Sequence, residues 1–134
     1  MSRVQLALRV SDLAASIAFY AKLFGVEPAK LRPGYANFAI DQPPLKLVLI
    51  EGEADRPTAM DHLGVEVFSR DEVIAATHRF SDSGLDTVTQ DNTECCFALQ
   101  DKVWVRGPGE EPWEVYVVKG DAGRFDEPTC RCCD

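Results

Sequence analysis

The sequence predicts an α+β fold in which two similar halves follow one another along the chain. The first observation is a strand-like alternation, with Val4, Leu6 and Leu8 on one face and Gln5 and Ala7 on the other. The second is that a helix-forming segment follows each alternating strand. The third is that strand-like segments follow each helix, so each half has the order strand, helix, then two or three strands.

In the first half, a helix is expected after the first strand. It should run from about Asp12 to Phe24, with Ser11 as the N-cap and Gly25 at its C-terminal end. Further strand-like segments follow it, the first of them weak, and Pro43–Pro44 is expected to form the turn between the last two. These segments are residues 27–32, 35–40 and 45–50.

In the second half, Ser69-Arg70-Asp71-Glu72 has the pattern of a capping box, which predicts a helix to about Asp82 that ends at Gly84. The polar run from Gln90 to Glu94 has no strong strand signal and is expected to form a flexible loop. The strands expected in this half are residues 61–67, 87–90, 96–106 and 113–118.

The two halves also align residue by residue, which indicates an internal repeat. A shift of 57 residues places Gln5 on His62, and a shift of 68 residues places Lys46 on Glu114. We therefore expect one domain over residues 1–120. Its two modules cover about 3–52 and 60–120, and residues 121–134 form a mobile tail.

Bulk properties exclude several classes of function. A chain of 134 residues fits one compact domain, and its net charge of −8 repels phosphate backbones, so nucleic acid is not an expected partner. There is no apolar run long enough to span a membrane, and the N-terminus reads as a strand and not as a signal peptide. Five cysteines, an odd number, favour reduced thiols and a cytoplasmic location.

Three of the four repeat-related polar positions carry metal-binding groups. Gln5 offers an amide oxygen, His62 an imidazole and Glu114 a carboxylate, whereas Lys46 cannot bind a metal while it is protonated. Three such ligands with open positions suit Fe(II), Mn(II) or Zn(II). The alternative is that these residues have a structural role only. A single histidine on a strand is more often hydrogen-bonded than metal-bound, and Gln5 and Glu114 are also explained as solvent-facing residues of alternating strands.

The cysteines fall into two clusters. The adjacent pair Cys95 and Cys96 forms a compact soft chelate suited to Cu(I), Zn(II) or trivalent arsenic, or else it is simply two small residues at the edge of the core. Cys130, Cys132 and Cys133 lie in the tail. They are either a soft-metal trap or residues without a role, and the sequence favours neither.

These residues carry a resemblance to a known family, in segments that cover most of residues 3–121. The two βαβββ modules resemble the vicinal oxygen chelate superfamily, which includes glyoxalases, extradiol dioxygenases and bleomycin-resistance proteins. More narrowly, the chain resembles the organoarsenical carbon–arsenic lyases and the related cadmium-induced proteins. The matching segments are VQLALRVSDL, FYAKLFG, RPGYANFAI, PPLKLVLIEG, DHLGVEV, ECC and QDKVWVRGPGEEPWEVYVVKGD.

The resemblance implies an Fe(II)-dependent dioxygenase that uses O2 to cleave the carbon–arsenic bond of trivalent organoarsenicals such as methylarsonite, releasing arsenite. By position, Gln5, His62 and Glu114 match the family's metal ligands, and Cys95 and Cys96 match its arsenic-binding thiols. Glutamine stands here where many relatives in the wider superfamily carry histidine. The resemblance does not indicate which organoarsenical is preferred.

Four further residues are candidates for lining the pocket: Lys46, Lys102, Tyr35 and Tyr116. Two other functions stay open at this point. One is a sequestration protein that binds arsenic, cadmium or a drug without turnover, and the other is a glyoxalase-like isomerase, against which the lysine at position 46 counts. Modules of this superfamily pair within one chain or across two, so a homodimer is one of the expected arrangements.

Overall fold

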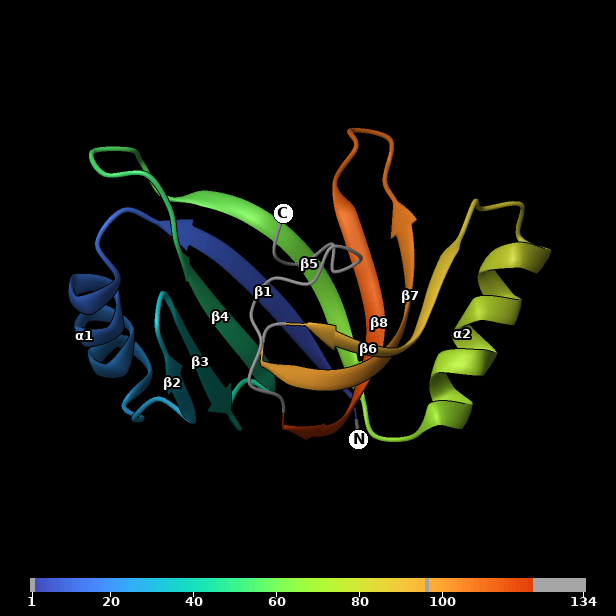
Figure 1. Ribbon diagram of the computed structural model, residues 1–134, viewed down its shortest axis with the longest axis horizontal. Coiled ribbons are helices and arrows are strands. Elements are labelled where there is room, and N and C mark those ends of the chain that lie inside the picture. The colour runs from blue at the N-terminus through green and yellow to red at the C-terminus, as the bar shows by residue number, and fades with distance from the viewer. Residues whose placement is uncertain (1, 96, 122–134) are drawn as a thin grey trace. The chain divides into compact units, whose positions relative to one another are not determined.

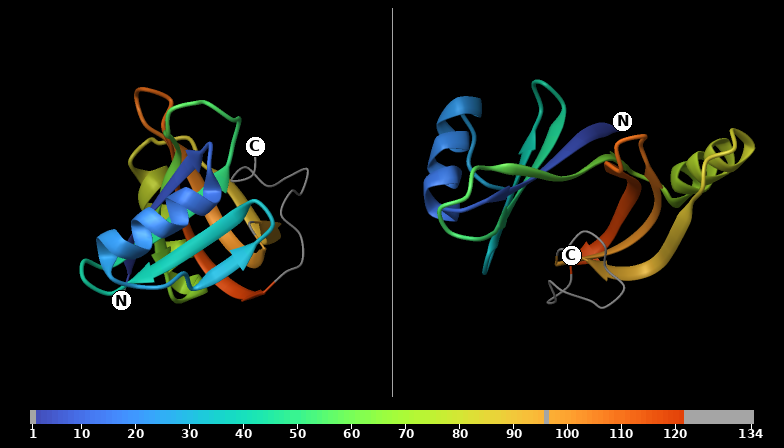
Figure 2. Two further views of the ribbon diagram at one scale, coloured as in Figure 1. Left: turned by 90° about the vertical axis from the view of Figure 1, so that its left-hand side faces the viewer. Right: turned by 90° about the horizontal axis from the view of Figure 1, so that it is seen from above.

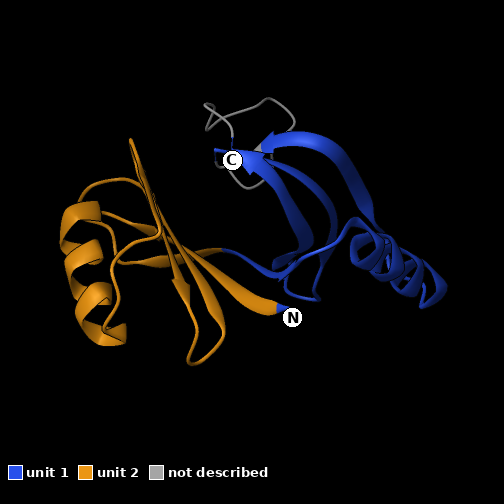
Figure 3. Ribbon diagram, turned by 90° about the horizontal axis from the view of Figure 1, so that it is seen from below, with its two compact units in different colours: residues 1–2, 62–134 blue, residues 3–61 orange. Residues whose placement is uncertain are grey.

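The computed structural model describes residues 2–95 and 97–121 (Figure 1). It divides into two compact units, coloured separately in Figure 3. We call residues 3–61 the N-terminal unit and the described residues from His62 to Asp121 the C-terminal unit. No helix in these described residues is both long enough and apolar enough to cross a membrane.

The N-terminal unit has the predicted order of one strand, one helix and three strands. Its strands are arranged in the order β2-β3-β4-β1, with β1 and β4 parallel and the other neighbours antiparallel. The elements are β1 (Arg3–Val10), α1 (Leu13–Phe24), β2 (Lys30–Arg32), β3 (Tyr35–Ile40) and β4 (Leu45–Glu51). The weak strand expected at 27–32 is thus present as the short β2.

Helix α1 begins one residue later than the sequence suggested. The prediction that Ser11 is the N-cap is wrong, because the Asp12 side chain accepts the Ala15 N–H at 3.0 Å. Aspartate is as good a cap as serine, so the sequence alone does not separate two adjacent candidates. At the other end, Gly25 has φ 68°, the left-handed conformation that favours glycine, and its N–H donates to the Ala21 carbonyl.

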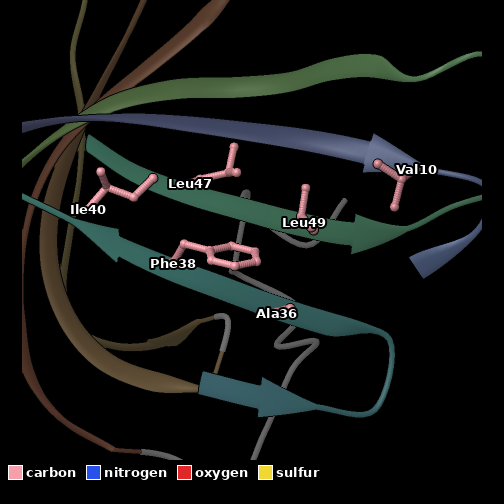
Figure 4. Packing of buried hydrophobic residues seen from close by; sticks show 6 residues of the cluster. All are labelled: Val10, Ala36, Phe38, Ile40, Leu47 and Leu49. Atoms are coloured by element: carbon pink, nitrogen blue, oxygen red, sulfur yellow. The ribbon is translucent and has the colours of Figure 1, made fainter. Parts of the chain in front are cut away.

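The core of the N-terminal unit lies between α1 and one face of its strands (Figure 2). Figure 4 shows six buried side chains from β1, β3 and β4 gathered on that face. They are Val10, Ala36, Phe38, Ile40, Leu47 and Leu49. The apolar stripe of α1 packs against them through half-buried residues, among them Ile17 and Phe24. Because side chains alternate along a strand, Gln5 and Lys46 point to the opposite face.

The C-terminal unit repeats this order of elements. Its strands are arranged β5-β8-β7-β6, with β5 and β8 parallel and the remaining neighbours antiparallel. The elements are β5 (Ala59–Val67, which begins in the N-terminal unit), α2 (Arg70–Asp82), β6 (Val88–Cys95), β7 (Ala98–Arg106) and β8 (Pro112–Asp121). Helix α2 packs its buried Val73 and Ala76 against Val103 and other valines of the sheet.

The capping box predicted for α2 is confirmed. Ser69 is the N-cap, and its hydroxyl accepts the Glu72 N–H at 3.3 Å. The Glu72 carboxylate returns to accept the Phe68 N–H at 3.1 Å and the Ser69 hydroxyl at 3.0 Å. These bonds satisfy backbone donors that the first turn of a helix leaves without partners.

The prediction of a loop at residues 90–94 is wrong, because β6 continues through this polar run to Cys95. The register against β7 changes from Gln90 opposite Lys102 to Thr93 opposite Gln100, so two residues of β6 oppose one residue of β7. This arrangement is a β-bulge. The polar sequence is therefore accommodated in the sheet by one extra residue, which alternation-based reasoning does not detect.

Candidate metal and substrate site

A buried histidine–glutamate pair lies in the C-terminal unit. His62 Nε2 is 2.9 Å from Glu114 Oε2, and both side chains are almost completely buried. His62 comes from β5 and Glu114 from β8, two parallel neighbouring strands. The sequence thus places these two residues on one face, as the repeat predicted.

The register between β5 and β8 differs from the one that the repeat suggests. In the N-terminal unit, Gln5 lies directly opposite Lys46. In the C-terminal unit, the residue opposite Glu114 is Gly64 and not His62. His62 precedes Gly64 by two residues, so its side chain points to the same face of the sheet as that of Glu114. The His62 side chain still reaches the carboxylate, with 2.9 Å between Nε2 and Oε2.

A buried lysine completes the surroundings of this carboxylate. Lys102 Nζ lies 2.8 Å from Glu114 Oε1, and its side chain has 0 % exposure to solvent. Each carboxylate oxygen therefore faces a different partner, His62 at Oε2 and Lys102 at Oε1. The sequence named Lys102 only as a pocket candidate, and the ion pair was not predicted.

The negative charge of Glu114 is stabilised by its neighbours. Burial alone raises the pKa of Glu114, but the Lys102 ammonium and the hydrogen bond from His62 outweigh it and hold the pKa well below its usual range. Glu114 is therefore a carboxylate, the form that binds a metal ion.

Aromatic rings surround the charged groups. The Lys102 ammonium lies 5.5 Å from the centre of the Trp104 ring and 5.7 Å from that of Tyr116. The His62 ring meets Trp104 edge-on, with the ring centres 5.6 Å apart. The indole N–H of Trp104 donates to Gln90 Oε1 at 3.0 Å, which fixes the ring. Trp104 and Gln90 were missed in the sequence, although Trp104 shares its strand face with Lys102.

The chemistry of His62 and Glu114 fits a divalent metal ion. An imidazole nitrogen and a carboxylate oxygen are donors that divalent metal ions accept. The two atoms lie 2.9 Å apart at hydrogen-bonding distance, and a metal ion bound to both would replace that hydrogen bond. Because Lys102 engages Oε1, the carboxylate offers Oε2 as a single ligand atom. Among the described residues, no group of three His, Cys, Asp or Glu side chains gathers as a metal site, so this pair supplies two donors.

Gln5 and Tyr35 belong to the N-terminal unit. The side chain of Gln5 is 4 % exposed and lies on the face of β1 away from α1. Tyr35 is buried on the equivalent face of β3, where its hydroxyl accepts a hydrogen bond from Asn37 Nδ2 at 3.0 Å. Lys46 is half-buried in this unit, and Tyr116 is buried in the C-terminal unit.

The thiol pair is only partly within the described residues. The backbone of Cys95 ends β6 and pairs with Ala98, whereas Cys96 lies outside the described part of the chain. Cys130, Cys132 and Cys133 lie in residues 122–134, which are also outside it. Their roles stay predictions from the sequence.

Comparison with known proteins places this chain in a family. Residues 3–115 match the family model described as Glyoxalase/Bleomycin resistance protein/Dioxygenase superfamily. A protein of Thermomonospora curvata named trivalent organoarsenical cleaving enzyme is 65 % identical over 97 % of this chain and 88 % of its own. The cadmium-induced protein CadI of Mycobacterium bovis is 54 % identical over all of this chain and 94 % of its own.

The fold comparison agrees with the sequence comparison. The Mn(II)-bound glyoxalase of Novosphingobium aromaticivorans superposes with a TM-score of 0.63 at 21 % identity, over 96 % of this chain and 44 % of that one. The predicted fold of two βαβββ modules is thereby confirmed. The chain belongs to the glyoxalase/bleomycin resistance protein/dioxygenase superfamily, the vicinal oxygen chelate proteins.

Proposed function

We propose that this protein is an Fe(II)-dependent dioxygenase that cleaves the carbon–arsenic bond of trivalent organoarsenicals such as methylarsonite and releases arsenite. The observation that carries the proposal is the buried His62–Glu114 pair, separated by 2.9 Å, in a chain 65 % identical to a relative named for organoarsenical cleavage. A net charge of −8 also favours a small-molecule substrate over nucleic acid.

In this proposal Gln5, His62 and Glu114 hold the metal ion. Bound there, Fe(II) would supply a Lewis acid with open coordination positions for O2. Lys102 keeps Glu114 ionised and holds its Oε1 atom, so that Oε2 faces His62. The Trp104 and Tyr116 rings cover the Lys102 ammonium, which limits the access of water to the ion pair.

Cys95 and Cys96 bind the arsenic atom of the substrate in this proposal. Thiolates are soft ligands with a high affinity for soft centres such as trivalent arsenic. Two thiols that capture the arsenical next to a metal site hold the reactants together, an effect worth on the order of 7–11 kcal/mol in favourable cases. Reduced thiols of this kind suit a cytoplasmic protein.

The decisive experiment measures turnover. Protein purified without oxygen is loaded with Fe(II), then mixed with O2, methylarsonite and a thiol reductant, and the arsenite released is counted per chain. We expect many arsenite molecules per chain and none when Fe(II) or O2 is left out. Release of no more than one arsenite per chain would contradict the proposal.

Two substitutions separate the proposed roles. Glu114→Ala should lose Fe(II) binding while it keeps arsenical binding, because the carboxylate is assigned to the metal alone. Cys96→Ser should do the reverse. Glu27→Ala, at an exposed glutamate in the segment after α1, serves as the control and should keep both properties. If Glu114→Ala and Cys96→Ser lose the same property, the division of roles is wrong.

A second candidate is a sequestration protein that binds arsenic or cadmium without turnover. The 54 % identity to a protein named for its induction by cadmium favours this candidate. It needs the thiols but not the metal pair. Stoichiometric binding of trivalent arsenic that survives in Glu114→Ala, with no arsenite released by the unchanged protein, would support it against the lyase.

A further inference from the structure

A single buried carboxylate, Asp101, holds the bulge in β6. Asp91 and Asn92 together oppose Asp101 of β7, so one backbone N–H of the bulge loses its partner in the ladder. The Asn92 N–H donates instead to Asp101 Oδ1, at 2.8 Å. Asp101 is 1 % exposed, and its other oxygen, Oδ2, makes no hydrogen bond within the described residues.

Two cations link this carboxylate to neighbouring elements. Lys119 of β8 lies 3.4 Å from both oxygens of Asp101, and it also donates a hydrogen bond to the Asn92 side chain. Arg70, the first residue of α2, lies 3.8 Å from Asp101 Oδ2 and 3.9 Å from Asp91 Oδ2. Asp101 therefore connects the bulge to α2 and to β8.

The bulge itself needs such support. Asn92 has φ 51°, in the left-handed region that residues other than glycine adopt at a cost, although asparagine tolerates it better than most. Backbone in such a conformation persists when the surrounding structure holds it in place. The Asp101 hydrogen bond and the Lys119 contact to Asn92 do so here.

The bulge determines which residues of β7 the last residues of β6 pair with. With it, the backbone of Cys95 pairs with Ala98. If the pairing of Gln90 with Lys102 continued without a bulge, Cys95 would instead stand opposite Phe97, one position along. A slip of one residue moves every following position to the other face of the sheet.

We propose that Asp101 is a positioning residue for Cys95, because it holds the bulge that sets the backbone register of the strand that ends at Cys95. This inference rests on the proposed function, in which Cys95 and Cys96 bind the arsenical. Asp101 is the residue before Lys102 in β7, so its side chain points to the opposite face of the sheet from His62 and Glu114.

The test compares two substitutions of Asp101, with phenylarsine oxide as the probe. Asp101→Leu removes the acceptor, and we expect the affinity for the probe to fall at least tenfold. Asp101→Asn keeps an oxygen that can accept the Asn92 N–H, and its affinity should stay within threefold of the unchanged protein. A cavity of about 130 Å³ borders Asp101, Arg70 and Asp91, so a leucine side chain has room there.

Two controls separate positioning from a general loss of structure. Fe(II) binding should change less than twofold in both variants, and Asp86→Leu, at an exposed aspartate of the same unit, should bind the probe normally. Deletion of Asn92 removes the extra residue while it leaves the pairing of Thr93 with Gln100 possible. In that background, Asp101→Leu should cause no further loss.

The outcomes that overturn the inference are distinct from those that overturn the proposed function. A folded Asp101→Leu protein that binds the probe with unchanged affinity overturns the positioning role, as does a tenfold loss in Asp101→Asn. The result for Asp101→Asn tests the positioning role even if Asp101→Leu does not fold. If the unchanged protein binds phenylarsine oxide no better than its Cys95→Ser and Cys96→Ser variants, the proposed function fails, and this inference falls with it.

Discussion

At Lys102, a positive charge lies in the interior of the C-terminal unit with Glu114 as its counter-charge. Replacing it with methionine keeps most of the volume but leaves the carboxylate buried without a cation. Breaking a buried ion pair in this way costs about 3–5 kcal/mol. We expect Lys102→Met to lower the free energy of unfolding by that amount, as measured by urea denaturation of the metal-free protein.

The same measurement has two matched controls. Lys22→Met, at an exposed lysine of α1, should leave the stability unchanged within about 0.5 kcal/mol. The double substitution Lys102→Met with Glu114→Gln removes both charges and should recover at least half of the loss. A double variant as unstable as the single one would show that the ion pair is not the cause.

Residue types alone pointed to His62 and Glu114, which the structure brings together, but not to the other side chains around them. His62 and Glu114 were predicted from the repeat because each is a polar residue at a fixed position of an apolar strand. The contact between Lys102 and Glu114 depends on the register of β7 against β8, in which Trp104 opposes Glu114. That register is set by the turn between the two strands and by packing. The sequence therefore predicted Lys102 as a pocket residue but did not predict its contact with Glu114.

At the scale of elements, the N-terminus of α2 depends on its cap. Ser69→Ala removes the hydroxyl that accepts the Glu72 N–H, and loss of such a cap costs about 1 kcal/mol. We expect thermal unfolding to show this loss. Ser81→Ala, at an exposed position near the C-terminal end of the same helix, should have little effect. An equal loss in both variants would mean that helix propensity, and not capping, is being measured.

Glu72 makes the stability of this helix end depend on pH. The Phe68 N–H and then the Ser69 hydroxyl donate to its carboxylate and lower the pKa of Glu72 from its ordinary value of 4.5. A lowered pKa in the folded state means that the contribution is present above pH 4.5 and is lost as the pH falls through the lower folded value. The stability difference between the unchanged protein and Glu72→Gln should therefore shrink on acidification below pH 4.5. A difference that does not change with pH would contradict this assignment.

Elements defined by local signals were predictable, and those defined by distant contacts were not. Both helices were predicted from signals that lie close together in the chain, such as Gly25 at the end of α1 and the capping box of Ser69 and Glu72 at the start of α2. The polar half of β6 is a strand because Asp101, nine residues beyond Asn92, satisfies its bulge. No local pattern in the run from Gln90 to Glu94 indicates this partner.

At the scale of the whole molecule, the repeat has preserved a fold while the chemistry of its two halves has diverged. Equivalent strands carry Gln5 and Lys46 in the N-terminal unit but His62 and Glu114 in the C-terminal unit. The carboxylate and the imidazole therefore belong to one unit, and the amide that we propose as the third ligand belongs to the other. Metal affinity should accordingly depend most on the C-terminal unit.

Metal loading is the test of this asymmetry. A ligand present at 100 times its dissociation constant stabilises the folded state by about 2.7 kcal/mol, so Fe(II) added without oxygen should raise the Tm by several degrees and a chelator should reverse the rise. His62→Ala and Glu114→Gln should abolish the rise, whereas Gln5→Ala should lose only part of it, because a neutral amide is a weaker ligand than an imidazole or a carboxylate. Glu27→Gln should keep the full rise. A full rise in Glu114→Gln would remove the carboxylate from the metal site, and an equal loss in Gln5→Ala and His62→Ala would contradict the unequal roles of the two units.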